Sequence, residues 1–267
     1  GYRPINGGHY KRTGVELSLN TLNIQTPNFK WTSSLALSHY NAYWIERMPN
    51  FDYKKYQKRE NEPMSAYYYY KTVGVINEDR SNMPDSQRSL PREAQLPGYP
   101  IIDDRNGDGK IDVNDKYLYK STTPDATIGF STSLKYKNWD LSTSLRAVIG
   151  NYVYNNFASQ SNVQNIATND YLQNISSVAA SYGFKNVQFW SDIFVEDASF
   201  VRMDNLTLGY NFKDIFSKGS SLRIYGMAQN VFVITDYSGV DPEIFGNIDN
   251  GFYQRPKIYS LGLNFNF

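Results

Sequence analysis

Strict alternation between apolar and polar side chains is the feature that most limits what this chain can fold into. It is clearest from Ala126 to Asn155, which reads as two long strands joined by a turn at residues 135–138. The apolar face of the first strand is interrupted only by Thr132. A period of two predicts strands, because successive side chains of an extended chain point to opposite faces. The period fits both a soluble sandwich and an outer-membrane barrel, in which the apolar face meets lipid and the polar face meets the lumen.

The same pattern recurs along the chain and predicts an all-β, antiparallel fold. We expect strands at Thr13–Asn20, Phe29–Arg47, Ala66–Ile76, Ala126–Tyr136, Trp139–Asn155, Glu196–Phe212, Ser221–Thr235 and Gln254–Phe267. A short helix is expected near residues 171–181.

The lengths of the connections favour the barrel. Short turns at 26–28, 135–138 and 213–220 alternate with long loops such as 156–192 and 236–253. Outer-membrane barrels sort their connections this way, with short periplasmic turns and long extracellular loops. Counting back from the C-terminus puts the 26–28 turn on the periplasmic side only if one more strand exists. We place that strand within residues 95–103.

Composition narrows the function. Hydrophobic residues make up only 40% of the chain, yet 16% of it is aromatic, including 23 Tyr. This balance fits a barrel with a polar lumen and aromatic girdles, and it would also fit a secreted, soluble, calcium-dependent β protein that binds carbohydrate. A net charge of +1 gives no reason to expect a nucleic-acid partner. No apolar run is long enough for a membrane-spanning helix, and any export signal is expected to lie outside this chain.

One stretch carries a specific chemical pattern, the twelve residues from Asp104 to Asp115. Oxygen-bearing side chains stand at loop positions 1, 3, 5, 9 and 12, Gly109 stands at the sharp turn and Ile111 is the apolar anchor. This spacing predicts a structural Ca²⁺ loop, with a carbonyl from the seventh position among the ligands, which are Asp104, Asn106, Asp108, Lys110, Asp112 and Asp115. The final Asp in place of the longer Glu and the lack of flanking amphipathic helices distinguish the loop from a helix–loop–helix sensor. A metal-free Asp/Asn/Gly turn is the alternative.

Catalytic patterns are weak, and we expect no enzyme activity. His9 and His39 are the only histidines and lie in no metal-binding spacing, and no GxSxG or GxGxxG sequence occurs. Four consecutive tyrosines, Tyr67 to Tyr70, could stack on sugar rings, but a membrane-interface girdle or lumen lining is the favoured interpretation. Some residues of the long loops could touch a ligand, although loop packing is the favoured explanation for them: Phe189, Trp190, Tyr237 and Asp241.

Several stretches together resemble the C-terminal part of the barrel of SusC/RagA-type TonB-dependent outer-membrane transporters. They are DDRNGDGKIDVNDK, YKNWDLSTSLRAVIGNYVYN, VEDASFVRMDNLTLGYNF, LRIYGMAQNVFVITDYSGVDPEI and the final PKIYSLGLNFNF. The opening RTGVELSLN is similar to a strand start in the wider transporter class, and the terminal Phe267 resembles a barrel-assembly signal. The matching stretches follow the family order over most of residues 13–267.

The resemblance implies a function and a set of partners. It implies that residues 1–267 form part of a roughly 22-stranded barrel in the outer membrane, in contact with its lipid. The plug and the remaining strands would then lie outside this chain, either because the chain is a fragment or because another polypeptide supplies them. The implied activity is TonB-energised import of oligosaccharides or oligopeptides, with a SusD-like surface lipoprotein over the mouth.

Overall fold

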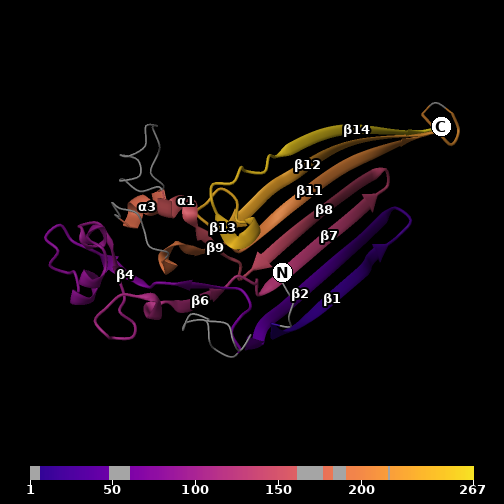
Figure 1. Ribbon diagram of the computed structural model, residues 1–267. Coiled ribbons are helices and arrows are strands. Elements are labelled where there is room, and N and C mark those ends of the chain that lie inside the picture. Colours follow the sequence, from indigo (N-terminus) through magenta and orange to yellow (C-terminus); the bar gives the residue numbers. More distant parts are fainter. Residues whose placement is uncertain (1–6, 48–60, 161–176, 183–190, 216) are drawn as a thin grey trace, which may run out of the picture.

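The computed structural model describes residues 7–47, 61–160, 177–182, 191–215 and 217–267. Within these residues the main feature is one curved antiparallel sheet of seven strands, ordered β1-β2-β7-β8-β11-β12-β14 (Figure 1). Its strands are β1 (Gly8–Gln25), β2 (Phe29–Arg47), β7 (Ala126–Tyr136), β8 (Trp139–Ile149), β11 (Phe200–Lys213), β12 (Ser221–Thr235) and β14 (Ile258–Asn266). The fold is all-β and mostly antiparallel, as expected.

Tight turns close one end of this sheet. In the β1–β2 turn the amide of Thr26 donates to the carbonyl of Phe29 (2.7 Å), and the Phe29 amide donates to Oγ1 of Thr26 (3.0 Å). Lys137 in the β7–β8 turn and Asp214 in the β11–β12 turn take the left-handed conformation, with φ of 53° and 54°. The three predicted short connections are therefore confirmed, and the long connections gather at the opposite end of the sheet (Figure 1).

The long connections fold into a second layer of structure at that end. It contains three small sheets built from β3 (Ala66–Tyr69) with β6 (Tyr117–Ser121), β4 (Thr72–Val75) with β5 (Pro100–Ile102), and β10 (Val195–Asp197) with β9 (Tyr152–Asn155) and β13 (Ile248–Asp249). Helical segments join them: η2 (Asp85–Ser89), η3 (Arg92–Gln95), η4 (Val113–Asp115), α1 (Asn156–Gln160), α3 (Ser177–Tyr182), η5 (Asp192–Phe194) and η6 (Phe245–Asn247). Among the described residues no helix has the length and hydropathy needed to cross a bilayer.

Two stretches expected to supply strands of the large sheet do not, and the strand expected at Trp139–Asn155 ends at Ile149, since Tyr152–Asn155 is β9 of the loop layer. Residues 66–76 do not form one strand of the large sheet but split into β3 and β4, which pair with β6 and β5 in the loop layer. Apolar residues there do not alternate with polar ones because they pack inside that layer, where Tyr67 and Ile76 are buried. Nor does the stretch 95–103 supply an extra wall strand, since its β5 also pairs in the loop layer. With neither strand in the sheet, the short turns all fall at one end.

The structure also tests the predictions for the four tyrosines and for the helix near residues 171–181. The hydroxyl of Tyr67 donates to the carbonyls of Tyr152 and Asn247, at 2.9 and 2.6 Å. The first of the four tyrosines is therefore a core residue of the loop layer and not part of a girdle or a stacking platform. The helix expected near 171–181 is seen as α3, and residues 171–176 lie outside the described part of the chain.

The two faces of the sheet differ sharply in chemistry. One row across five strands consists of Leu19, Leu35, Phe130, Leu145 and Met203. The next row, on the opposite face, consists of Asn20, Ser34, Ser131, Ser144 and Asn205. In the described part of the chain no second sheet covers the apolar face, and on β14 the side chains of Leu261 and Leu263 are 90% and 69% exposed. The sheet is thus one layer with a bare apolar face, which is not a sandwich.

A single polar row crosses the apolar face at Thr21, Ser33, Thr132 and Thr143. Its side chains hydrogen-bond locally. Oγ1 of Thr132 accepts from the Trp31 indole (2.8 Å) and lies 3.1 Å from Oγ of Ser33, while Oγ1 of Thr143 donates to the Asn205 carbonyl (2.8 Å). These hydroxyl groups are thus paired with neighbouring groups of the sheet itself.

Candidate functional site at the loop end of the sheet

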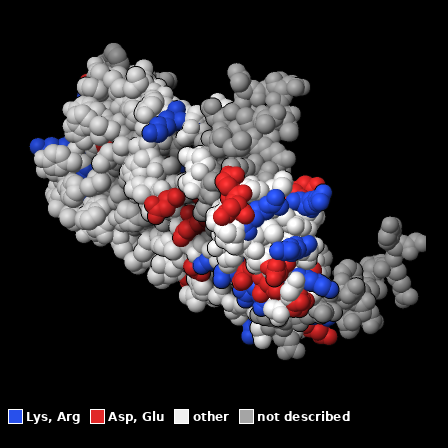
Figure 2. All heavy atoms as spheres, turned by 90° about the vertical axis from the view of Figure 1, so that its left-hand side faces the viewer, with Lys and Arg blue, Asp and Glu red and all other residues white. Residues whose placement is uncertain are grey.

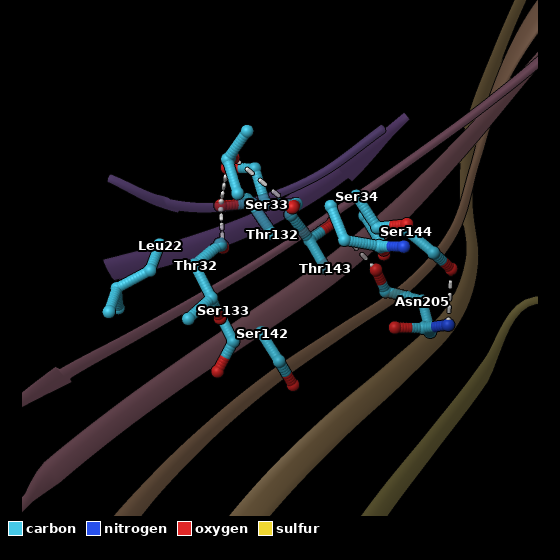
Figure 3. Close-up of a pocket in the computed structure, with 13 residues that line it drawn as sticks. Leu22, Thr32, Ser33, Ser34, Thr132, Ser133, Ser142, Thr143, Ser144 and Asn205 are labelled. Atoms are coloured by element: carbon cyan, nitrogen blue, oxygen red, sulfur yellow. Dashed lines mark hydrogen bonds between the residues drawn. The ribbon is translucent and has the colours of Figure 1, made fainter. Parts of the chain in front are cut away.

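The polar face carries a hollow of about 630 Å³ lined mainly by small hydroxyl side chains (Figure 3). Serine and threonine residues of β2, β7 and β8 form its surface, and Asn205 of β11 borders it, donating to Oγ of Ser144 (2.6 Å). These side chains are short, so another surface can approach the backbone closely here. They also offer donors and acceptors without charge. The hollow suits contact with a polar partner.

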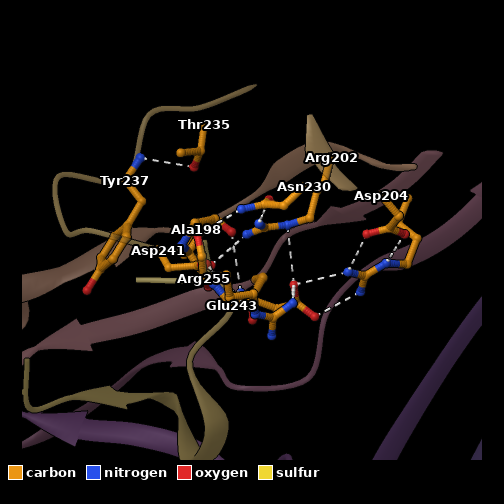
Figure 4. Close-up of polar contacts among 12 residues, drawn as sticks. Ala198, Arg202, Asp204, Asn230, Thr235, Tyr237, Asp241, Glu243 and Arg255 are labelled. Atoms are coloured by element: carbon orange, nitrogen blue, oxygen red, sulfur yellow. Dashed lines mark hydrogen bonds and ion pairs between the residues drawn. The ribbon is translucent and has the colours of Figure 1, made fainter. Parts of the chain in front are cut away.

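Three arginines and three carboxylates join the polar face of the sheet to the loop between β12 and β14. We call this cluster the arginine anchor. Its members are Arg146, Arg202, Asp204, Asp241, Glu243 and Arg255 (Figure 4). On β8, Nε of Arg146 lies 2.6 Å from Oδ2 of Asp204, and its Nη1 lies 2.8 Å from Oε1 of Glu243. Glu243 also accepts from Nη1 of Arg255 at 2.6 Å. The Glu243 carboxylate therefore links β8 of the large sheet to Arg255, which lies where the loop returns to β14.

Arg202 of β11 forms the buried half of the anchor, with its side chain only 2% exposed. Its Nη2 donates to Oδ1 of Asp241 (2.7 Å), and its Nη1 donates to Oδ1 of Asn230 (2.6 Å). Asn230 in turn donates through Nδ2 to the Arg255 carbonyl at 2.9 Å. A buried guanidinium needs such partners, because an unpaired buried charge is strongly destabilising.

Irregularities in two strands aim these side chains. The register between β11 and β8 shifts between Met203 and Asn205, so Asp204 has no partner on β8 and is free to turn its carboxylate to Arg146. Opposite it on β12, Asn230 takes a φ of 49°, which asparagine tolerates better than most residues. Bulges of this kind re-aim side chains next to functional sites. Periodicity in the sequence did not reveal the anchor, since its ion pairs join residues far apart in the chain.

The anchor perturbs the ionisation of Glu243. Partial burial opposes the charged form, but the hydrogen bond from Arg146 and the charges of Arg146, Arg255 and Arg202 outweigh it, holding the pKa of the Glu243 carboxyl below its usual value. Glu243 is therefore charged at neutral pH, as its bridging role requires.

Of the loop residues considered as ligand contacts, two are packed inside the loop layer. Tyr237 is 5% exposed and its hydroxyl donates to Oδ2 of Asp249 at 2.8 Å. Burial first, and then this hydrogen bond, raise the pKa of Tyr237 well above its usual value. Asp241 belongs to the anchor. Loop packing, the favoured explanation, therefore holds for both, while Phe189 and Trp190 lie outside the described residues.

The predicted calcium loop is a compact turn closed by its own amides. Oδ1 and Oδ2 of Asp104 accept from the amides of Gly107 and Gly109, each at 2.8 Å. Both glycines have positive φ, 70° and 81°, which explains glycine at the sharp turn. Asp115 is fully buried, and its carboxylate accepts from the amides of Arg105 (3.0 Å) and Asp112 (2.7 Å).

The chemistry of this loop fits a hard cation better than its side-chain orientation does. The side chains at five of the six positions, together with the backbone carbonyl of Lys110, offer oxygens of the type that Ca²⁺ prefers. Among the described residues, however, no three His, Asp or Glu side chains converge as a metal site would require. Asp112 and Asp115 instead form a reciprocal capping box at the start of η4. The structure brings the predicted residues into one turn without gathering their carboxylates around a common centre.

The surface at the loop end is mixed in charge. Figure 2 looks onto this end of the molecule and shows acidic and basic side chains lying next to one another over part of it. No large field of one sign is visible on that face, in keeping with the near-neutral net charge of +1.

The sequence of this chain is similar to part of several known receptors. The sequence is 34% identical over 276 residues to the TonB-dependent receptor SusC of Bacteroides thetaiotaomicron, covering 98% of this chain and 27% of SusC. The chain corresponds to part of a SusC/RagA-type TonB-dependent receptor. TonB-dependent receptor P3 of Formosa agariphila is 28% identical over 309 residues, which cover 98% of this chain and 29% of that receptor. No family model matches the sequence.

Solved structures agree with this assignment at the level of the fold. The chain superposes on the RagAB peptide transporter with a TM-score of 0.68 at 20% identity, covering 97% of this chain and 29% of that one. The 'open-open' state of the RagAB peptide importer gives a TM-score of 0.69 at 21% identity, with the same coverage. The seven-stranded sheet and its loop layer therefore share the fold of part of those chains. The chain spans less than a third of the length of these relatives.

Proposed function

We propose that this chain forms part of the wall and the extracellular loops of an outer-membrane importer driven by TonB. The observation that carries the proposal is the one-layer sheet, whose apolar face is exposed while its polar face bears the loops' arginine anchor. In water an apolar face of this extent would be a liability, whereas in an outer-membrane barrel it faces acyl chains. Barrels of transporters with a plugged lumen have about 22 strands, so other strands would complete the wall.

The proposed cargo is an oligosaccharide or an oligopeptide. The titles of the RagAB structures, a peptide transporter and a peptide importer, support the peptide part of this range, and the oligosaccharide part rests on the sequence resemblance. A SusD-like lipoprotein is the proposed partner at the mouth. The polar hollow lined by Ser131, Ser144 and Asn205 is the proposed seat of a plug, because its short uncharged side chains allow close approach.

Purification tests the proposal. The protein containing this chain should be recovered from outer membranes in mild detergent, and it should migrate faster on a gel before boiling than after. Mass spectrometry of the purified material should identify a surface lipoprotein and the rest of the barrel. Recovery of this chain alone as a water-soluble monomer would overturn the proposal.

We also propose that the Asp104–Asp115 loop binds Ca²⁺ and stiffens the loop layer. The support is the set of oxygen ligands at calcium-loop spacing and the two left-handed glycines. Calorimetric titration of the chelator-treated protein with CaCl₂ should show binding that Asp108→Asn weakens at least tenfold. Asp85→Asn on η2, a matched change outside the loop, should leave it unchanged. Equal heats from all three proteins would contradict the proposal.

A further inference from the structure

The end of β12 nearest the loop layer lacks a strand partner on one side. β12 pairs with β11 along Ser221–Thr235, but with β14 only along Ser221–Gln229. In the described part of the chain no strand pairs with residues 230–235 on the side of β14. An unpaired strand end presents backbone donors and acceptors that another extended chain can bind.

Two residues explain why the pairing stops there. Pro256 has no amide hydrogen to offer to a ladder, and β14 begins two residues later, at Ile258. Asn230, in its left-handed conformation, uses its side chain to hold the carbonyl of Arg255 (2.9 Å). The incoming chain is therefore tied to the wall by a side chain at this level and not by strand pairing (Figure 4).

A cavity of about 580 Å³ lies beside this unpaired end. Its lining comes from β11, β12 and the loop that joins β12 to β14, and consists of Arg202, Asn230, Phe232, Val233, Val240, Asp241, Tyr253, Gln254, Arg255, Pro256 and Lys257. The lining holds three cations and one carboxylate. Because Arg202 pairs with Asp241 and Arg255 pairs with Glu243, the remaining charge comes from Lys257, which is exposed.

We propose that this cavity binds a short extended peptide carrying a carboxylate, with the peptide pairing along residues 230–235 of β12. Strand addition to a sheet edge uses the regularly spaced amides of a peptide, which an oligosaccharide does not have. The positive lining attracts a C-terminal or side-chain carboxylate to Lys257. The inference rests on the proposed importer function and narrows its cargo to peptides.

The dimensions favour a small ligand. Cavities of 300–1,000 Å³ are typical of small-molecule sites. Tyr253, almost fully exposed, and Val240, more than half exposed, both line the cavity and give apolar surface for side chains of the ligand. The cavity thus offers backbone pairing, a cationic end and an apolar rim.

The test measures peptide binding by the full receptor purified in mild detergent. The probe is a fluorescent acidic tetrapeptide, Ala-Val-Ala-Glu, and the competitors are the same peptide methylated at alternate amide nitrogens, its uncharged Gln amide analogue, and a neutral glucose tetrasaccharide. The unmodified peptide should compete. Amide methylation and loss of the carboxylates should each weaken competition at least tenfold, and the tetrasaccharide should not compete.

Variants locate the site. Lys257→Glu should weaken peptide binding at least tenfold, because it reverses a charge in the lining. Lys213→Glu, the same change at the other end of β11, should have no effect. Equal binding by both variants, or equal competition by the methylated peptide, would overturn the inference.

The experiments distinguish a failure of the peptide inference from a failure of the importer function. If the receptor takes up the tetrasaccharide but does not bind the peptide, the cargo inference is wrong and the importer function stands. Absence of this chain from outer membranes would remove the importer function itself.

Discussion

Glu243 contacts the guanidinium groups of three arginines. Arg146 lies on β8, the buried Arg202 lies on β11, and Arg255 lies in the loop between β12 and β14. The Glu243 carboxylate lies 2.8 Å from Arg146, 2.6 Å from Arg255 and 3.5 Å from Arg202. Most single ion pairs at a surface contribute little, but networks that share one carboxylate and partly exclude water contribute more. The free energy that holds the 236–257 loop to the wall should therefore depend on this residue.

Glu243→Gln should release that loop without unfolding the sheet. The amide keeps the shape of the side chain but loses its charge, which we expect to cost about 1.5–3 kcal/mol, the usual value for hydrogen bonds to charged groups. Hydrogen exchange of residues 236–257 should accelerate about tenfold or more, while exchange in β7 and β8 stays the same. Glu16→Gln on β1 is the matched control, and equal exchange in both variants would show that the network does not hold the loop.

The same contact should respond to acid. The docked loop lowers the pKa of Glu243 below that of the released loop, about 4.3 for an unperturbed Glu. Docking is thus fully stabilised above that value and loses this contribution as pH falls through the lower, docked pKa. Exchange of the loop amides should rise between pH 5 and pH 3 relative to the intrinsic rate. Glu243→Gln should abolish that rise, and an unchanged pH dependence in the variant would assign it to other carboxylates.

At this scale the sequence predicted little of the site. The spacing of Asp104–Asp115 predicted a loop with Gly109 at its sharp turn, and the structure places that glycine in the left-handed conformation, because a local motif fixes its own backbone geometry. The arginine anchor was not predictable, since its pairs join β8 and β11 to a loop that follows β12. Nothing in the period of two shows that Asp204 stands in a bulge.

At the scale of the strand, β12 and β14 are matched through a tyrosine that covers a glycine. Tyr225 lies opposite Gly262, and a Cβ built on that glycine would lie 2.3 Å from the Tyr225 ring. The Arg223 guanidinium stacks over the same ring, 4.5 Å from its centre. Aromatic side chains over strand glycines pin the register of neighbouring strands.

Gly262→Ala should weaken the pairing of the last strand. The added methyl displaces the Tyr225 ring, and we expect a cost of about 1 kcal/mol, the scale of one cross-strand pair. Gly226→Ala on β12 is the control, because its new Cβ would meet only a Leu261 methyl group at an ordinary 3.6 Å. The folded band on unboiled gels should disappear at a lower temperature for Gly262→Ala only. Identical melting of the two variants would show that Tyr225 does not set the register.

Element by element, the sequence predicted strands well wherever one face is apolar and the other polar. It failed at residues 66–76, where Tyr67 and Ile76 are buried in the loop layer and the apolar side chains do not alternate with polar ones. The same limit explains the extra strand wrongly expected within 95–103.

At the scale of the whole molecule, the proposed function depends on whether the apolar face of the sheet contacts lipid. Leu35 and Ser34 are neighbours on β2 that point to opposite faces, Leu35 pairing with Leu19 and Phe130, and Ser34 with Asn20 and Ser131. Arginine on the lipid face of an outer-membrane barrel costs about 2–4 kcal/mol near the bilayer midplane, whereas lumen positions tolerate polar changes. Leu35→Arg should therefore reduce assembly of the heat-modifiable barrel, and Ser34→Arg should not. If Leu35→Arg assembles as well as Ser34→Arg, the apolar face does not meet lipid, and a transmembrane wall would no longer explain its exposure.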